Sequence, residues 1–430
     1  MTSAFSPKLV EEAREHLRGV VRETPLQFHK GLSEKFGAKI YLKREDLQVV
    51  RSYKLRGAYN RMRLLTAPEK KRGVVCASAG NHAQGVAFSC NALKIKGIIF
   101  MPKNTPRQKI DRVRALGKSF VGIELYGDTF DEAFKEALGV SQKKHMVLVH
   151  PFNDPFVIAG QGTVGAEILE QISAIGGSSS GGKEHIDFVV VPIGGGGLIS
   201  GLGSYIKSKS PSTKIIGVEP VGAPSMAKAL EAGKVITLEK LDTFVDGTAV
   251  RTVGDLTLNI CKKVLDRLII VPEGKVCETM ISLYQRDGIV AEPAGALSIA
   301  ALDELKIELS AGGGGKTVVC ILSGGNNDIS RYPEVIERSL VYQGLKHYFI
   351  INFSQRPGAL RRFLDDALGP TDDITLFEYT KKNNRENGPA LVGVELARKK
   401  DLQPLMKRMD AIGMSYELLK SDSPVFKFII

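Results

Sequence analysis

The chain has 430 residues, of which 43% are hydrophobic, so it is long enough to bury more than one core. No stretch reaches the roughly 18 uncharged apolar residues that a membrane span needs. The Lys and Arg residues behind the net charge of +12 are scattered and form no basic block interleaved with aromatic residues, so we expect neither a membrane nor a nucleic-acid partner.

The chain begins with the polar segment MTSAFSPKLVEEAREHLRGV, which leads into a helix and does not read as a signal peptide. The five cysteines lie far apart in no metal-ligand spacing. We therefore expect buried free thiols, without a disulfide framework or a zinc site. These features predict a cytoplasmic protein, or one in an organelle that it reaches with a removed leader.

From residue 70 to residue 330, short β-branched runs alternate with Gly-rich turns and helical patterns. The runs are RGVVCAS, KGIIFMP, IDFVVVPIG, KIIGVEP and TVVCILSGG. Continuous apolar runs between helices are typical of a parallel sheet covered on both faces, so we expect an α/β architecture. The small polar stretch Ala174–His185 has nothing to pack, and we expect a surface loop there.

Two segments place polar residues just before a helical pattern. The first is KREDLQVVRSYKLRGAYN, in which Tyr53 and Lys54 precede the helix, and a desolvated lysine is suited to act as a base. The second is VVCASAGNHAQGVAFS, in which Ser78 to His82 lie between a strand and a helix. A helix N-terminus of this kind is suited to hold a carboxylate.

The chain contains two runs of four glycines, Gly194–Gly197 and Gly312–Gly315. The first follows the strand DFVVVPI and precedes a helix, a context in which backbone N–H groups bind phosphate. The second precedes the strand TVVCIL, at the opposite end of the sheet, so we expect a simple turn. Leu202 stands where a Walker loop needs lysine and no GxGxxG is completed, which favours a small phosphorylated cofactor over a nucleotide.

The pattern changes after residue 345. KHYFIINF, DITLFEYTKK, ALVGVELA and SYELLK read as strands, and PGALRRFLDDAL and LQPLMKRMDAIG read as helices. This order is βαββαβ, which predicts a separate, small α+β domain.

In this order, the motifs SYKLRGA, SAGNHAQGVA, GGGGL and LSGGN resemble those of the threonine dehydratases (threonine ammonia-lyases), which are fold type II pyridoxal 5′-phosphate enzymes. The C-terminal segments FSQRPGALRRF, LFEYTKK and LVGVELARKKDLQPLMKRM are similar to the ACT-like regulatory domain of biosynthetic members, present here once. The resemblance implies a catalytic domain of two open twisted α/β subdomains at 1–335, with the small subdomain inserted at about 47–152. A linker at 336–345 and a regulatory domain at 346–430 would follow.

The resemblance also implies a role for each motif. Lys54 would form the Schiff base with pyridoxal phosphate, and Tyr53 would lie beside the ring. Asn81 would hydrogen-bond the ring's O3′, and Ser323 would face the pyridine nitrogen. The phosphate would lie on Gly194, Gly195, Gly196, Gly197 and Leu198. The substrate carboxylate would lie on Ser78, Ala79, Gly80, Asn81 and His82.

The activity implied is β-elimination of L-threonine to 2-oxobutanoate and ammonia, the first step of isoleucine biosynthesis. L-Isoleucine would be the feedback effector of a homo-oligomer, either a dimer or a tetramer. In related racemases the region around Glu219 binds a cation, but Ser225 stands where those enzymes have an acid, so we expect no metal.

Three alternatives stay open. One is a serine dehydratase or serine racemase, although Ala79 stands where racemases of this family have a serine, and a methyl group delivers no proton. Another is an inactive scaffold that senses amino acids, which the intact Lys54, Asn81 and Ser323 argue against. The last is a nucleotide-dependent kinase, which the missing Walker lysine argues against.

Overall fold

The computed structural model describes residues 5–176, 185–311, 315–381, 386–420 and 423–429. The chain forms two compact units, Met1–Glu273 with Leu283–Asn327, and Gly274–Ser282 with Asp328–Ile430. The loop expected at Ala174–His185 and the turn expected at Gly312–Gly315 lie largely outside the described residues, so both stay predictions.

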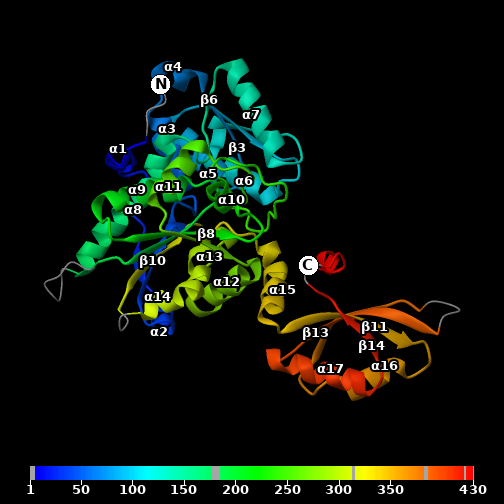
Figure 1. The fold of residues 1–430 in the computed structure, drawn as a ribbon. Helices are drawn as coiled ribbons and strands as arrows, with labels where there is room; N and C mark the ends of the chain where they lie inside the picture. The colour runs from blue at the N-terminus through cyan, green and yellow to red at the C-terminus, as the bar shows by residue number, and fades with distance from the viewer. Residues whose placement is uncertain (1–4, 177–184, 312–314, 382–385, 421–422, 430) are drawn as a thin grey trace. The chain divides into compact units, whose positions relative to one another are not determined.

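The first unit contains two open sheets (Figure 1). The larger sheet is built from β1 (Leu26–Phe28), β2 (Lys39–Arg44), β7 (Phe188–Pro192), β8 (Lys214–Pro220), β9 (Arg267–Val271) and β10 (Thr317–Leu322). Its strand order is β1-β2-β10-β7-β8-β9, and the edge strand β1 is antiparallel to β2 while the other neighbours pair in parallel. The sequence patterns did not predict this antiparallel edge.

The smaller sheet of the first unit is parallel throughout, with the order β5-β4-β3-β6. Its strands are β3 (Val74–Ala77), β4 (Gly97–Met101), β5 (Val121–Leu125) and β6 (Val147–Leu148). The two open sheets, one parallel throughout and one parallel except at its edge strand β1, confirm the predicted fold class.

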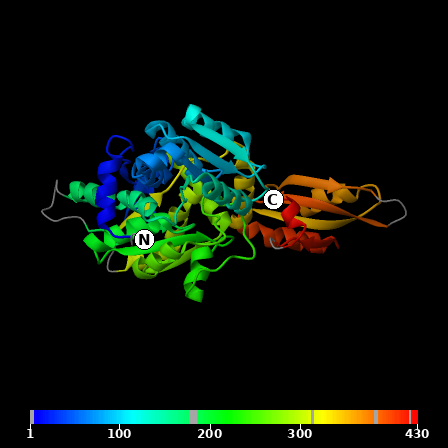
Figure 2. The same cartoon turned by 90° about the horizontal axis from the view of Figure 1, so that it is seen from above.

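Helices cover both faces of these sheets (Figures 1 and 2). Those of the first unit are α1 (Lys8–Leu17), α2 (Lys30–Phe36), α3 (Lys54–Arg63), α4 (Ala67–Arg72), α5 (Asn81–Leu93), α6 (Arg107–Gly117), α7 (Phe130–Lys144), α8 (Pro155–Gly176), α9 (Gly197–Lys209), α10 (Ser225–Ala232), α11 (Asp255–Val264), α13 (Pro293–Ala300) and α14 (Lys306–Ser310). The helix α12 (Glu273–Asp287) belongs partly to each unit. Every residue of β7 and β10 is buried, as a strand covered on both faces requires.

The second unit is a four-stranded antiparallel sheet with helices packed on it. Its elements are α15 (Tyr332–Gln343), β11 (Lys346–Ser354), α16 (Ala359–Arg362), β12 (Asp373–Tyr379), β13 (Asn387–Glu395), α17 (Leu402–Ala411), β14 (Ser415–Leu418) and α18 (Phe426–Ile429). The strand order β12-β13-β11-β14 and the buried cluster that joins Phe349, Phe363 and Leu405 confirm the predicted βαββαβ domain. The exact domain limits stay a proposal, since α15 occupies most of the predicted linker at 336–345.

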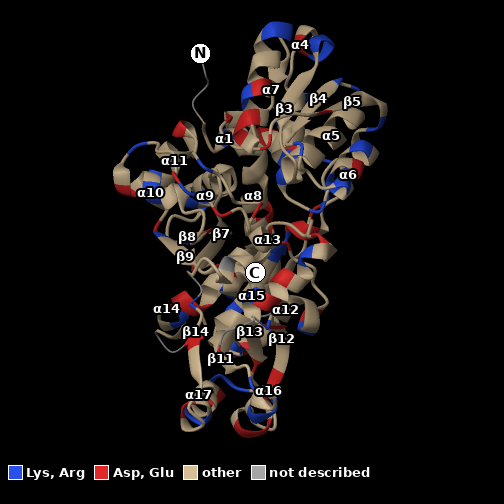
Figure 3. Cartoon of the chain, turned by 90° about the vertical axis from the view of Figure 1, so that its right-hand side faces the viewer, with Lys and Arg blue, Asp and Glu red and all other residues tan. Residues whose placement is uncertain are grey.

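The surface is mixed in charge. Lys and Arg are interspersed with Asp and Glu over both units (Figure 3). In the part of the chain that the structure describes, no helix is long and apolar enough to cross a membrane. The five cysteines are free and buried, as their apolar sequence neighbours indicate.

A buried ion network fixes the start of α3. Arg56 is fully buried, and its guanidinium lies 2.8 Å from Glu45 Oε1 and 2.5 Å from Glu167 Oε1. Glu167, on α8, also accepts from Lys43 Nζ of β2 at 2.6 Å. Two cations thus face two carboxylates, so the buried charge is balanced, and three elements are tied together two residues after Lys54.

We expect Arg56→Met to destabilise the protein by about 3 to 5 kcal/mol, because Glu45 would be left buried without its cation. Urea unfolding followed by circular dichroism measures this as a lower midpoint. The matched control is Arg18→Met. Arg18 and its partner Glu15 are both exposed to water, so this variant should leave the midpoint unchanged. Equal midpoints for the two variants would contradict the role of the network.

Candidate active site

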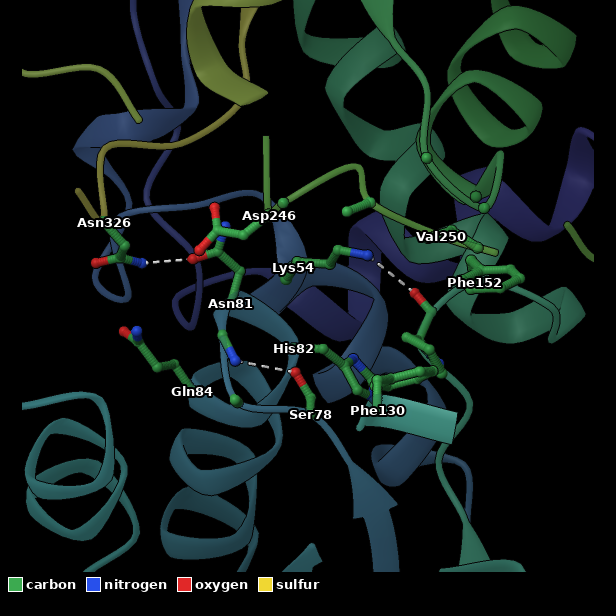
Figure 4. Close-up of a pocket in the computed structure, with 18 of the residues that line it drawn as sticks. Lys54, Ser78, Asn81, His82, Gln84, Phe130, Phe152, Asp246, Val250 and Asn326 are labelled. Carbon is green, nitrogen blue, oxygen red and sulfur yellow. Dashed lines mark hydrogen bonds between the residues drawn. The ribbon is translucent and has the colours of Figure 1, made fainter. Parts of the chain in front are cut away.

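A cavity of about 270 Å³ lies in the first unit, and residues from both sheets line it. All residues predicted for the site from the sequence line this cavity, with the exception of Ser323. They lie at or just before the starts of α3, α5 and α9. The helix α3 follows a loop, and α5 and α9 each follow the end of a strand. Figure 4 shows the side chains of Lys54, Ser78, Asn81 and His82 around this space.

The glycine run Gly194–Gly197 joins β7 to α9 and forms one wall of the cavity. Gly196 has φ +88°, a left-handed conformation that favours glycine. A Cβ on Gly197 would lie 2.9 Å from Phe152 Cβ, so a side chain there would displace Phe152. The first N–H groups of α9 have no partner within the helix, and the loop therefore forms an open cradle for an anion.

Lys54 is the first residue of α3, and its Nζ donates a hydrogen bond to Pro151 O at 3.2 Å. Burial lowers the pKa of Lys54 to about 8, and the nearby carboxylate of Glu292 partly opposes this shift. Nζ also lies 5.3 Å from the centroid of the Tyr53 ring. A fraction of the amine is neutral near neutral pH, as a nucleophile or base requires.

The segment from Ser78 to His82 joins β3 to α5. The Gly80 N–H donates to Ser78 Oγ at 3.2 Å, and α5 begins at Asn81 (Figure 4). The positive end of the α5 dipole and its unpaired N–H groups therefore meet the cavity, an arrangement that suits a carboxylate. Ala79 contributes only a methyl group.

His82 is buried, and its Nε2 lies 2.8 Å from Val149 O. Because a carbonyl only accepts, Nε2 carries a proton. Burial, together with the positive charge of Lys54, lowers the pKa of His82 to about 3, so the ring is neutral at neutral pH. At neutral pH this ring does not supply a proton to a ligand.

Ser323 follows β10 and is buried. Its hydroxyl donates to Ala294 O at 3.3 Å, and its carbonyl accepts from the Tyr53 N–H at 3.2 Å. Ser323 is thus hydrogen-bonded to the residue before Lys54, although it does not itself line the cavity.

Several cavity residues were not identified from the sequence, among them Glu292, Asn326, Phe152, Lys109 and Asp246. Lys109 on α6 and Asp246 form an ion pair of 2.7 Å at the cavity. Asn326 is the last residue of the motif LSGGN, which is the sequence signal for it, and Glu292 stands just before the proline that begins α13. The other three residues carry no sequence signal.

Glu219 holds the start of α10. Its carboxylate oxygens accept from the N–H groups of Met226 and Ala227, both at 2.8 Å. Burial raises the pKa of Glu219 to about 8, and these two hydrogen bonds oppose the shift. Among the described residues, no group of three or more His, Cys, Asp or Glu side chains is arranged to hold a metal ion.

Two family descriptions match this chain. Residues 17–324 match the family described as "Pyridoxal-phosphate dependent enzyme", and residues 337–429 match "C-terminal regulatory domain of Threonine dehydratase". The L-threonine dehydratase biosynthetic IlvA of Halalkalibacterium halodurans is 54% identical over 418 residues, which is 97% of each chain. The protein of the same name from Bacillus subtilis is 52% identical over 428 residues, covering 100% of this chain and 98% of the relative.

Solved structures agree with these matches. The processed form of threonine deaminase isoform 2 from Solanum lycopersicum superposes with a TM-score of 0.70 and 39% identity, over 79% of this chain and 96% of that one. Maize serine racemase superposes with a TM-score of 0.70 and 32% identity, over 79% of this chain and 99% of that one. The chain belongs to the fold type II pyridoxal phosphate-dependent enzymes, and within them to the biosynthetic threonine dehydratases.

Proposed function

We propose that this protein uses pyridoxal 5′-phosphate to convert L-threonine into 2-oxobutanoate and ammonia, the first step of isoleucine biosynthesis. The observation that carries the proposal is a single cavity into which a buried lysine amine, a glycine cradle and a helix N-terminus converge. Relatives named L-threonine dehydratase that match over the whole chain support the choice of substrate.

The residues present fit the cofactor. The glycine cradle before α9 would hold the phosphate. Its residues have no side chains, so the backbone N–H groups at this wall of the cavity can reach a phosphate directly. Lys54 would bond to the aldehyde carbon, with Tyr53 beside the ring. Asn81 would hydrogen-bond the ring hydroxyl. Ser323, which does not itself line the cavity, is assigned to the ring nitrogen from the family resemblance alone. When bound, pyridoxal phosphate supplies an electron sink for the α-carbon of the substrate.

The chain's own groups then account for the rest of the reaction. The start of α5, from Ser78 to His82, would bind the substrate carboxylate and so orient the α-carbon. Lys54 Nζ, once released by the incoming amino group, would take the α-proton. The β-hydroxyl would leave as water, so that the α-proton and the hydroxyl are lost together as one H2O. Hydrolysis of the resulting enamine would consume one water and yield 2-oxobutanoate and ammonia.

Ala79 separates this proposal from racemisation. Its methyl group lines the cavity and has no proton to give to the second face of the α-carbon. Although maize serine racemase shares the fold, we therefore propose elimination as the main outcome, with L-serine as a poorer substrate.

We further propose that the second unit makes the enzyme sensitive to L-isoleucine. Elimination needs no βαββαβ domain, and residues 337–429 match a regulatory domain of threonine dehydratase. The assembly of the chain into a dimer or tetramer and its cytoplasmic location stay predictions from the family resemblance.

We expect Lys54→Ala to lower 2-oxobutanoate formation from L-threonine by at least about 10³-fold, because the amine that anchors the cofactor and takes the proton is lost. A coupled keto-acid assay measures the rate. Lys30→Ala is the control, since Lys30 is an exposed lysine on α2. Turnover of Lys54→Ala close to that of the control would show that another group is the base.

We expect L-isoleucine to weaken the apparent affinity for L-threonine by about 5- to 150-fold, the range of ordinary coupling free energies. Threonine saturation curves of the intact protein, with and without L-isoleucine, measure this change. D-Isoleucine has the same composition and should leave the curve in place. Superimposable curves with and without the L-form would mean that the second unit does not sense isoleucine.

A further inference from the structure

Three side chains in the cavity, Asn326, Asn81 and Glu292, form a hydrogen-bonded chain, and the proposed mechanism gives a role only to Asn81. Asn326 Nδ2 donates to Val50 O at 2.8 Å and to Asn81 Oδ1 at 2.7 Å (Figure 4). Asn81 Nδ2 in turn donates to Glu292 Oε1 at 2.7 Å. The chain thus runs from a backbone carbonyl to a carboxylate and joins four segments that are separate in the sequence.

The two ends fix the direction of this chain. The carbonyl of Val50 only accepts, so the amide nitrogen of Asn326 must face it and face Asn81 Oδ1. Because Asn81 Oδ1 accepts from Asn326, Asn81 turns its own nitrogen toward Glu292, whose Oε1 accepts from it. One N–H of Asn81 is used by Glu292, which leaves its second N–H for a ligand in the cavity.

Glu292 is only 4% exposed. It sits against Gly324, where a Cβ would collide with Glu292 Oε1. The charged residues that line the same cavity as Glu292 are Lys54 of α3, Lys109 of α6 and Asp246 of the segment before α11. Burial, together with the negative charge of Asp246, raises the pKa of Glu292 to about 7.

We propose that Glu292 is a positioning residue for the cofactor: its carboxylate holds the Asn81 amide with the free N–H toward the cavity, and its negative charge helps to hold the proton on Lys54. This inference rests on the proposed cofactor site. It adds to that site a residue that touches Asn81 directly and acts on the cofactor through it.

The acceptor and the charge of Glu292 can be tested separately. Glu292→Gln keeps an acceptor oxygen for Asn81 Nδ2 and removes the charge, whereas Glu292→Leu removes both. We expect the Kd of pyridoxal phosphate, measured by fluorescence titration of the apoprotein, to rise about 10- to 100-fold in Glu292→Leu. In Glu292→Gln we expect a rise of no more than about threefold.

Glu219→Gln makes the same change at a buried carboxylate outside the cavity and should bind the cofactor as the unchanged protein does. An unchanged Kd in a folded Glu292→Leu variant would overturn the positioning role. Equal weakening in the Gln and Leu variants would also overturn it, because the retained acceptor would then have no effect. Failure of the unchanged protein to bind pyridoxal phosphate would instead overturn the proposed function itself.

A second measurement tests the charge and does not depend on the Leu variant. Covalent attachment of pyridoxal phosphate requires the neutral amine of Lys54, so the rate of attachment to the apoprotein rises with pH around the Lys54 pKa of about 8. In Glu292→Gln the ammonium loses a stabilising charge, and the midpoint should move to lower pH by about one unit. A midpoint at the same pH as in the unchanged protein would contradict the electrostatic part of the proposal.

Discussion

The buried contact between Arg56 and the carboxylates of Glu45 and Glu167 is the constraint on which the cavity depends. A guanidinium removed from water is stable only where its partners are held in place, so α3, the turn after β2, and α8 are locked together. Lys54 lies half a turn before Arg56, on the first residue of α3. The ion network therefore determines where the amine of Lys54 can be.

The rest of the site follows from a repeated arrangement. At one edge of each parallel sheet a strand ends, a short polar or glycine segment follows, and a helix begins. The unpaired N–H groups of α5 and α9 thereby meet the same cavity and give it two anion-binding walls. Between these walls the buried amine is kept partly neutral by desolvation. The combination suits a phosphorylated cofactor and an amino-acid carboxylate held at the same time.

Local sequence patterns were sufficient for the parts of the site that lie at strand-to-helix junctions. The motifs at Ser78 to His82 and Gly194 identified two cavity walls because each contains its own strand, turn and helix start, and the motif around Lys54 contains a helix start. The Asn81–Glu292 contact joins residues 211 positions apart, and the Arg56–Glu167 contact joins residues 111 positions apart. Such pairings depend on how the elements pack, and no local spacing encodes them. The antiparallel strand β1 has only three residues, too few to show a period.

The central claim is that Lys54 is the residue that carries the cofactor in this cavity. The most direct measurement is to load the protein with pyridoxal phosphate, reduce it with borohydride, digest it and locate the modified lysine by mass spectrometry. The account predicts one modified site, Lys54, and unmodified Lys43 and Lys109, which are held in ion pairs nearby. A stable adduct on any other lysine, with Lys54 unmodified, would contradict it.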